Sequence, residues 1–296
     1  SYDVAVANNG DIFVADYMRD KITRLDSSYT IKGVVGGRYS QPNNDANGQA
    51  LFFDLHAVAM DHGDSTDEFF YAGNTSHQTG RNGFGRSHIS KVCTGITVTA
   101  QCPKLGKLVA VGNPQTSIGG IAVQGNYVYA IGSAEILFKL NKSNLSIDTQ
   151  RNIGSDIRIF NNVRSDVVAA GDYVIVSDWH NNGKKACKFN ASNLSDATFG
   201  NGQHCLSLGF RPQAMAISGK ATASTSDDFL YLWRDHRNQT IIKYNATTGN
   251  KVGGYIRRGG APGRTQSSFG MDVGPDDHIY VAERGNSRRR YVSKFD

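Results

Sequence analysis

A short phrase recurs six times along the 296-residue chain and limits the architectures that the chain can adopt. Each copy is an apolar-rich segment that ends in a cation, followed by an apolar or aromatic residue and then usually by Asn or Asp. Successive cations lie 48 to 55 residues apart, except for a first interval of 67 residues that contains a Gly-, Asn- and Gln-rich insertion. A period of this length is typical of arrays of supersecondary units. The six cations are Arg24, Lys91, Lys139, Lys188, Lys243 and Lys294.

Two strand-like segments precede each copy of the phrase. The first is small and apolar, as in "HAVAM" and "GIAVQ", and the second is bulkier, as in "FFYAG" and "YVYAI". Gly, Asn and Asp turns separate the two, which predicts hairpins, and a looser fourth strand follows most copies. Small residues suit strands that crowd around an axis, whereas aromatic residues suit strands that pack between neighbouring sheets.

Six copies of a four-strand meander predict an all-β fold, a six-bladed β-propeller with four-stranded antiparallel blades. We expect one propeller domain over residues 1–296. The last copy stops after its third strand, so that blade has three strands or is completed by sequence outside this segment. The expected blades cover, approximately, residues 1–40, 50–112, 116–156, 162–208, 210–258 and 266–296.

The four cysteines form two local pairs, Cys93 with Cys102 and Cys187 with Cys205. No C-x-x-C pair and no histidine at zinc-finger spacing accompanies them, so structural zinc is not indicated. We expect two disulfides in an oxidising compartment, each joining the third strand of a blade to its fourth. The alternative is four buried thiols in a cytosolic protein.

Other features agree with export from the cell. The chain begins at Ser1 and enters a strand at once, which is typical of a processed or excised segment. No apolar run is long enough to span a membrane. The net charge is +6, and eight cationic residues crowd the last forty positions without an interleaved aromatic platform, so nucleic-acid binding is not indicated. Seven N-x-[ST] sequons are candidate glycosylation sites: Asn74, Asn141, Asn144, Asn190, Asn193, Asn238 and Asn245.

One position at the head of each first strand deserves comparison across the six copies. In order, the residues are Asp3, His56, Gly120, Asp166, Gln213 and Gly270. In a propeller this position lies at one mouth of the central channel, so Asp3, His56, Asp166 and Gln213 should face a common point. They would hold a hard cation such as Ca²⁺, or they would cap the channel and bind buried waters.

Further candidates lie in loops. The phrases "SDWHNNGKK" and "LWRDHRN" place aromatic and polar residues between the second and third strands of adjacent blades, which predicts a partner-binding surface or ordinary polar loop tips. The acidic run "DHGDSTDE" predicts an exposed hairpin tip. No catalytic motif is present, so no catalytic residue is assigned. The partner-binding candidates are Trp179, His180, Trp233, Arg234 and His236.

The segments "DVAVANNGDIFVADYMRDKITRLD" and "SSFGMDVGPDDHIYVAERGNSRRRYVSKFD" resemble the blade signature of NHL-repeat propellers. The resemblance extends over the whole chain as a repeat and is closest in the first and last blades. NHL-like propellers include the peptidyl-hydroxyglycine amidating lyases, whose zinc-binding histidines stand at the heads of first strands. The phrase "LHAVA" at His56 resembles the sequence around those histidines. The other blades offer Asp, Gly or Gln there, so a three-histidine zinc site is not implied. Calcium-dependent propeller hydrolases and lactonases resemble the chain more loosely.

These features predict a secreted NHL-like propeller that binds a glycan or protein partner as a recognition, adhesion or structural module. The alternative is a Ca- or Zn-dependent lyase or hydrolase with its site at the channel mouth. We also expect that the open last blade could accept a strand from a neighbouring subunit, which would produce self-assembly.

Overall fold

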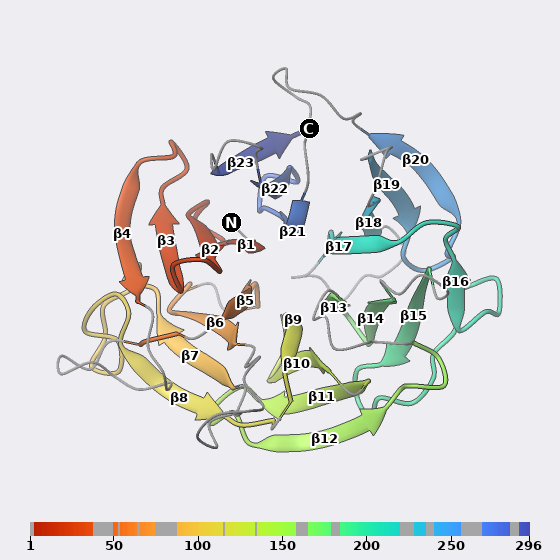
Figure 1. Cartoon of the computed structure of the whole chain (residues 1–296), viewed down its shortest axis with the longest axis horizontal. Coiled ribbons are helices and arrows are strands. Elements are labelled where there is room, and N and C mark those ends of the chain that lie inside the picture. Colours follow the sequence, from red (N-terminus) through yellow and green to blue (C-terminus); the bar gives the residue numbers. More distant parts are fainter. Residues whose placement is uncertain are drawn as a thin grey trace.

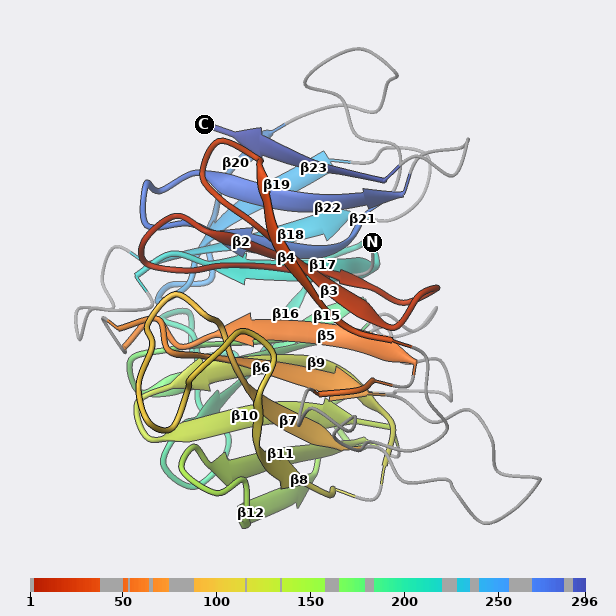
Figure 2. The same ribbon diagram turned by 90° about the vertical axis from the view of Figure 1, so that its left-hand side faces the viewer.

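The computed structural model describes most of the chain. The described residues are 3–37, 50–52, 54–63, 66–74, 88–114, 116–133, 135–157, 165–178, 184–219, 228–234, 240–255, 268–284 and 290–296. Six antiparallel sheets lie around a central axis, which confirms the six-bladed β-propeller (Figure 1). In the view turned by 90°, β5, β9 and β22 run along the short axis of the disc (Figure 2). The described residues contain no helix with the length and hydropathy needed to cross a membrane.

The strands have the following bounds. Blade 1 contains β1 (Asp3–Val6), β2 (Ile12–Asp16), β3 (Lys21–Leu25) and β4 (Ile31–Gly36), and blade 2 contains β5 (Leu55–Met60), β6 (Phe69–Asn74), β7 (Ile89–Cys93) and β8 (Leu108–Gly112). Blade 3 contains β9 (Ile118–Gln124), β10 (Tyr127–Gly132), β11 (Ile136–Asn141) and β12 (Ile147–Asn152), and blade 4 contains β13 (Val167–Ala170), β14 (Tyr173–Asp178), β15 (Lys185–Asn190) and β16 (Cys205–Ser207). Blade 5 contains β17 (Pro212–Ile217), β18 (Phe229–Arg234), β19 (Thr240–Asn245) and β20 (Lys251–Tyr255), and blade 6 contains β21 (Ser268–Val273), β22 (Ile279–Arg284) and β23 (Arg290–Phe295).

Strand order follows the sequence outward in every blade, from the axis to the rim. The first strands are small and largely buried, so six of them fit around the axis. Aromatic side chains of the second strands fill the space between blades, as in the contact of Phe13 with Phe70, whose ring centres are 5.4 Å apart. Blade 6 has three strands in the part of the chain that the structure describes.

In blades 1 and 3 the repeated cation joins neighbouring blades. Lys139 lies 3.8 Å above the ring of Tyr127, and its Nζ donates to the carbonyl of Ser192 in blade 4 at 2.5 Å. Arg24 of blade 1 donates in the same sense to the carbonyl of Thr94 in blade 2, at 3.2 Å. An ammonium or guanidinium group over an aromatic face and against a carbonyl is electrostatically favourable. In these two blades the cation of the phrase therefore links its own blade to a turn of the next blade.

The Asn or Asp that ends the phrase forms the turn into the fourth strand. The Oδ1 atom of Asp26 accepts the backbone N–H groups of Ser28 and Thr30, at 3.0 and 2.9 Å. The Oδ1 atom of Asn245 accepts those of Thr247 and Thr248 in the equivalent turn of blade 5. A short polar side chain that binds the backbone two or more residues ahead stabilises such turns.

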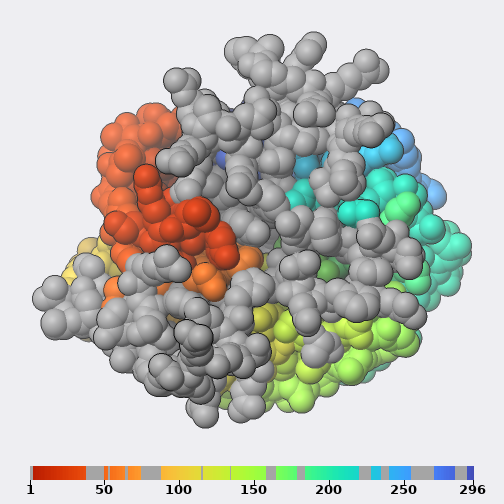
Figure 3. Space-filling model, viewed as in Figure 1, coloured from red at the N-terminus to blue at the C-terminus, as the bar shows by residue number. Residues whose placement is uncertain are grey.

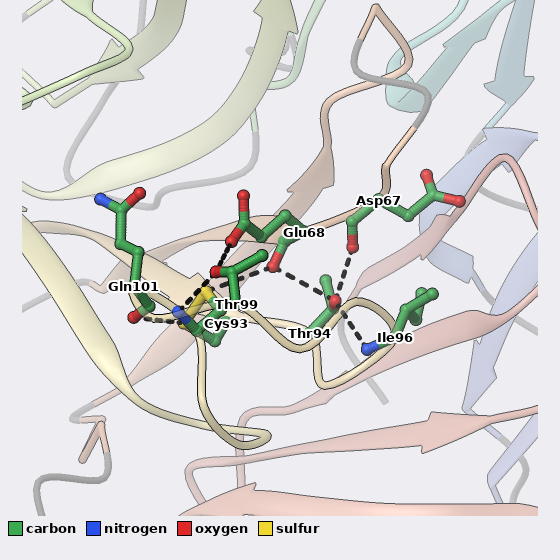
Figure 4. The surroundings of a disulfide bond; sticks show 8 residues. Asp67, Glu68, Cys93, Thr94, Ile96, Thr99 and Gln101 are labelled. Atoms are coloured by element: carbon green, nitrogen blue, oxygen red, sulfur yellow. Dashed lines mark hydrogen bonds between the residues drawn. A yellow bond between two sulfur atoms is a disulfide. The ribbon is translucent and has the colours of Figure 1, made fainter.

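Both predicted disulfides are present. Cys187 on β15 pairs with Cys205 on β16, and so joins the third and fourth strands of blade 4 as expected. Cys93 on β7 pairs with Cys102, which lies in the loop before β8 rather than on the strand itself. In that loop, the Cys102 N–H donates to Oγ1 of Thr99, whose hydroxyl in turn contacts Glu68 (Figure 4). The bridge of blade 2 therefore fixes a loop.

The acidic run after β5 differs from its prediction. Asp61 and Asp67 are 3% exposed, not exposed at a hairpin tip. Asp67 accepts the backbone N–H groups of Asn8 and Asn9 in blade 1, at 2.8 and 2.9 Å. Asp61 forms an ion pair with Lys142 of blade 3 at 2.6 Å. The run therefore binds blade 2 to the blade on either side of it.

Candidate functional site

The central channel contains a small cavity. Its volume open to the centres of water molecules is about 40 Å³. Most of its wall consists of Val, Ala, Ile and Met side chains from the first strands. Since a buried water needs roughly 10–15 Å³ by this measure, the cavity has room for about three waters. Its polar lining residues are Asp3, His62, Asp166 and Asp272.

Asp3 connects blade 1 to blade 2. Its Oδ1 accepts the N–H of the next residue, Val4, at 2.9 Å. Its Oδ2 accepts the N–H of Val58 on β5, in the neighbouring blade, at 2.8 Å. One carboxylate thus accepts two backbone N–H groups at the axis. These groups lie on the inner edges of the first strands, which do not pair with another strand of their own blade.

Asp166 repeats this arrangement half a turn away. Its Oδ1 accepts the N–H of Val167, and its Oδ2 accepts the N–H of Met215 in blade 5, both at 2.8 Å. Asp272 forms a third connection in blade 6, because its Oδ2 accepts the N–H of Val6 in blade 1 at 2.8 Å. Hydrogen bonds between a carboxylate and a backbone N–H are stronger than those between neutral groups. These three carboxylates therefore hold three of the six blade boundaries together at the axis.

The glycines at the heads of first strands make room for these carboxylates. A Cβ atom at Gly120 would lie 2.6 Å from Oδ1 of Asp166 in the next blade. A Cβ atom at Gly270 would collide with the carboxylate of Asp3. The residues at the heads of the first strands follow the same order in each half of the ring. Blades 1 to 3 have Asp, His and Gly, and blades 4 to 6 have Asp, Gln and Gly. The channel has an approximate two-fold repeat within its six-fold ring.

His56 and Gln213 occupy equivalent positions and do not line the cavity. Both are 5% exposed. The Nδ1 atom of His56 lies 2.8 Å from the carbonyl of Asp54, and its ring meets the edge of Tyr17 at 4.8 Å between centres. Oε1 of Gln213, at a β-bulge of β17, is buried without a hydrogen-bond partner. Of the four predicted channel residues, Asp3 and Asp166 therefore share the cavity, with Asp272 and His62 as neighbours that sequence reasoning missed.

The structure also shows where metal-ligating groups cluster. Within the described ranges, two groups bring three His, Cys, Asp or Glu ligand atoms within 4.8 Å of one another, and neither contains a predicted channel residue. One is Asp156, Asp196 and His204, and the other is His204 with the disulfide-bonded Cys187 and Cys205. Calcium in the channel stays a prediction.

The predicted loop residues divide into two kinds. Trp233 lies on β18 with no exposed surface and packs in the core between blades 5 and 6, so its prediction as an accessible loop residue is wrong. Arg234 follows it at the end of the strand, 5.6 Å from the ring of Phe210. Trp179, His180 and His236 lie outside the described residues.

The candidate glycosylation sites differ in access. Asn144 and Asn193 are exposed at equivalent turns of blades 3 and 4. Asn74 is 1% exposed and lies 2.6 Å from Nε2 of His88, so it is no acceptor in the folded protein. Asn141, Asn190 and Asn245 are partly buried, and Asn238 lies outside the described residues.

Shifted pKa values occur between blades 4 and 5. Burial lowers the pKa of Lys188, and the nearby Asp228 carboxylate opposes this shift. Burial also raises the pKa of Tyr173, as does the hydrogen bond that its hydroxyl donates to Asp228 at 3.0 Å. Both shifts follow from packing at a blade boundary.

Comparison with known proteins does not assign a function, so the assignment depends on the geometry of the channel and its residues. No family model matches the sequence, and no curated protein matches it. The residues themselves provide a narrow channel whose carboxylates are hydrogen-bonded across blade boundaries, inside a ring of six sheets. Such a channel holds the ring closed and admits a few waters.

Proposed function

We propose that this chain is an NHL-like propeller that binds a protein or glycan partner outside the cell, as a recognition, adhesion or structural module. The two disulfides support an oxidising compartment. The exposed turns at Asn144 and Asn193 are suited to glycosylation in a secretory pathway.

The observation that carries this proposal is that the channel carboxylates are hydrogen-bonded to the backbone across blade boundaries. Asp3, Asp166 and Asp272 each accept one N–H from their own strand and one from the following blade. The cavity between them, about 40 Å³, is far smaller than the roughly 300 Å³ at which small-molecule pockets begin. This narrow cavity supports a partner site on the outer surface of the ring.

The outer strand of blade 1 offers the best-defined contact surface among the described residues. Ile31 and Val34 on β4 are 65% and 49% exposed, and Tyr29 in the preceding turn is 44% exposed. Figure 3 shows blade 1 (red) at the rim of the molecule. Neighbouring exposed apolar side chains mark protein contacts more often than glycan contacts, because aliphatic groups offer no hydrogen bonds to a sugar. We therefore favour a protein partner at this strand.

Binding arrays of secreted and cell-surface proteins, alongside glycan arrays, test this proposal. We expect a protein ligand whose affinity falls at least tenfold on Ile31→Asp combined with Val34→Asp. The matched control is Val252→Asp on β20, a strand at the rim of blade 5, where Val252 is 54% exposed. Equal loss in both variants, or binding to glycans alone with no effect of either, would contradict a protein contact at β4.

A second candidate is a metal-dependent lyase or hydrolase at the channel mouth. The buried Oε1 of Gln213, which lacks a hydrogen-bond partner, favours it, because a cation would satisfy this oxygen. Calcium titration followed by thermal unfolding separates the two functions. A calcium-dependent rise in melting temperature that disappears in Gln213→Leu would support the metal enzyme, and no response would leave the binding module.

Self-assembly is a further element of the proposal. β23 is the outermost described strand of blade 6, so a strand from another subunit could extend this sheet along the outer edge of β23. Sedimentation over a range of concentrations tests it directly. Reversible dimers or larger species would support strand exchange, and monomers at all concentrations would contradict it.

A further inference from the structure

A second polar cluster lies far from the axis, at the outer boundary between blades 3 and 4. Arg151 belongs to β12, the outer strand of blade 3, and Asp156 lies in the turn that follows. Asp196 and His204 lie between β15 and β16 of blade 4. The cluster therefore combines side chains from two blades and uses none of the channel residues.

The distances from the His204 imidazole to the two carboxylates suit ligands of one metal ion better than hydrogen bonds. Nε2 of His204 lies 3.5 Å from Oδ1 of Asp196 and 3.8 Å from Oδ2 of Asp156. Good hydrogen bonds between nitrogen and oxygen are shorter than this, at about 2.7–3.2 Å. With zinc–ligand bonds of about 2.0–2.2 Å, two ligands of a tetrahedral ion are roughly 3.4 Å apart.

The hydrogen bond at Nδ1 of the imidazole directs the lone pair of Nε2 toward the carboxylates. Nδ1 of His204 lies 3.0 Å from the carbonyl of Ala197, which can only accept, so Nδ1 carries the proton. In the neutral ring Nε2 is then an acceptor that faces two further acceptors. Nε2 of His204 and Oδ2 of Asp156 are both buried without a hydrogen-bond partner. A cation between them would satisfy both atoms at once.

Neighbouring groups hold this arrangement in place. One guanidinium nitrogen of Arg151 lies 2.6 Å from Oδ1 of Asp196 and 3.8 Å from Oδ2 of Asp156, and another donates to the carbonyl of Leu194 at 2.8 Å. The ring of Phe189 meets the edge of the His204 ring at 4.9 Å and lies 5.3 Å from the guanidinium. A carbonyl on the second imidazole nitrogen and a hydrogen-bonded carboxylate are typical supports of metal ligands. Because this guanidinium contacts both carboxylates, it has to move away from Oδ1 of Asp196 when a metal ion binds, and its positive charge weakens cation binding.

We propose that Asp156, Asp196 and His204 bind one divalent transition-metal ion, with zinc as the best match, and so join blade 3 to blade 4 at the rim. One imidazole nitrogen and two carboxylate oxygens form a donor set that zinc accepts, whereas calcium and magnesium prefer oxygen alone. Asp196 is half exposed, with 54% of its side chain accessible, so a water can complete the coordination. The cysteines nearby are disulfide-bonded and supply no thiolate.

Titration of the metal-free, disulfide-intact protein with Zn²⁺ alone tests this site. We expect one ion per chain by calorimetry and a higher melting temperature with zinc. His204→Gln and Asp156→Asn should each weaken binding at least tenfold, while unfolding of the zinc-free variants verifies that they fold. The matched control is His278→Gln, because Nε2 of His278 also lies close to a carboxylate, 2.7 Å from Asp296, but on the surface of blade 6. This control should bind zinc as the unaltered protein does.

Three results would overturn the proposal. They are no zinc binding by the oxidised protein, equal binding by His204→Gln, and binding only after the disulfides are reduced. Cobalt substitution identifies the donors independently, because thiolate ligands produce an intense charge-transfer band that nitrogen and oxygen ligands lack. Absence of this band in a cobalt-loaded protein supports the assigned residues, and its presence contradicts them.

Discussion

Blades 4 and 6 contain the same phrase, "KACKFN" and "YVSKFD", and yet they place its lysine in different surroundings. Lys188 in blade 4 is 7% exposed, lies 4.0 Å above the ring of Tyr173, and reaches the carbonyl of Ala246 in blade 5 at 3.3 Å. Lys294 in blade 6 is exposed and pairs with Asp276 of its own blade at 2.7 Å. The repeated phrase puts a lysine at the same position in each of these blades. The residues packed around that lysine determine whether it is buried against the next blade or pairs with a carboxylate at the surface.

The covering segments explain the difference. In blade 4, the segment between β15 and β16 places the ring centre of Phe199 5.2 Å from Nζ of Lys188. The Cys187–Cys205 disulfide holds this segment against the sheet. In blade 6, β23 is the outermost strand among the described residues. The pKa values move in opposite directions accordingly. Burial lowers the pKa of Lys188, whereas the hydrogen bond to Asp276 raises that of Lys294.

The largest expected effect comes from opening the bridge of blade 4. Replacing Cys187 and Cys205 by Ala should lower the free energy of unfolding by about 2–4 kcal/mol, since the unfolded chain regains conformational freedom. The Cys93–Cys102 bridge closes a segment half as long, 9 residues of separation against 18, so its removal should cost about 0.6 kcal/mol less. Urea unfolding of both double variants measures this. A loss below that of the blade 2 variant would contradict a role for this bridge in covering Lys188.

Removing the two lysines compares the blades directly. Lys188→Ala should lower the free energy of unfolding by roughly 1–3 kcal/mol, because it leaves a cavity between Tyr173 and Phe199 and removes a donor to Ala246. Lys188→Met keeps the volume without a buried charge and should lie within about 1 kcal/mol of the unaltered protein. Lys294→Ala should leave the melting temperature nearly unchanged. Equal losses at Lys188 and Lys294 would show that burial in blade 4 does not matter.

The smallest effect concerns the pH dependence of blade 6. Burial alone would raise the pKa of Asp276, but hydrogen bonds from Lys294, Tyr280 and the backbone of His278 lower it below its ordinary 3.8. A lowered pKa stabilises the fold above the unfolded value, and this contribution is lost as pH falls through the folded value. Asp276→Asn should therefore be slightly less stable at neutral pH and equal to the unaltered protein well below pH 3.8.

Melting temperatures of the two proteins from pH 7 downward test this prediction. The difference should also shrink with added salt, because the pair is exposed. A difference that stays constant to low pH would show that the amide changes the turn rather than the charge.

The fold could be predicted from sequence because its signals repeat. The cation, the turn-forming Asn or Asp and the small first strands recur in each copy, so six weak patterns support one another. The disulfide pairs could be predicted for the same reason, since each joins segments adjacent in the meander. Alternation within a single copy would not have distinguished a propeller from a sandwich.

The candidate site could be predicted only in part. Asp3 and Asp166 were found because they occupy one column of the repeat. Asp272 lies two residues deeper, inside the apolar segment "GMDVG", where the column comparison does not reach. A carboxylate within a strand of small apolar residues was the available signal. His62 was missed because it lies in an acidic run that favoured an exposed turn.

Trp233 and the rim cluster show what sequence cannot provide. "LWRDHRN" contains both the end of a strand and a loop, so the sequence did not determine on which side of the boundary Trp233 lies. Asp156, Asp196 and His204 belong to two blades and occupy no shared position in the repeat. Their proximity depends on how neighbouring sheets twist against each other, which only the assembled ring determines.

The most direct test of the central claim, that the channel carboxylates are connections between blades, is the unfolding of Asp166→Asn with and without a metal chelator. The His204→Gln background removes the proposed rim site from the comparison. We predict that Asp166→Asn loses about 1–3 kcal/mol, as expected when a buried N–H such as that of Met215 loses its acceptor, and that the chelator changes neither protein. If instead the chelator destabilises the His204→Gln protein and Asp166→Asn abolishes that response, the channel is a metal site and the account is wrong.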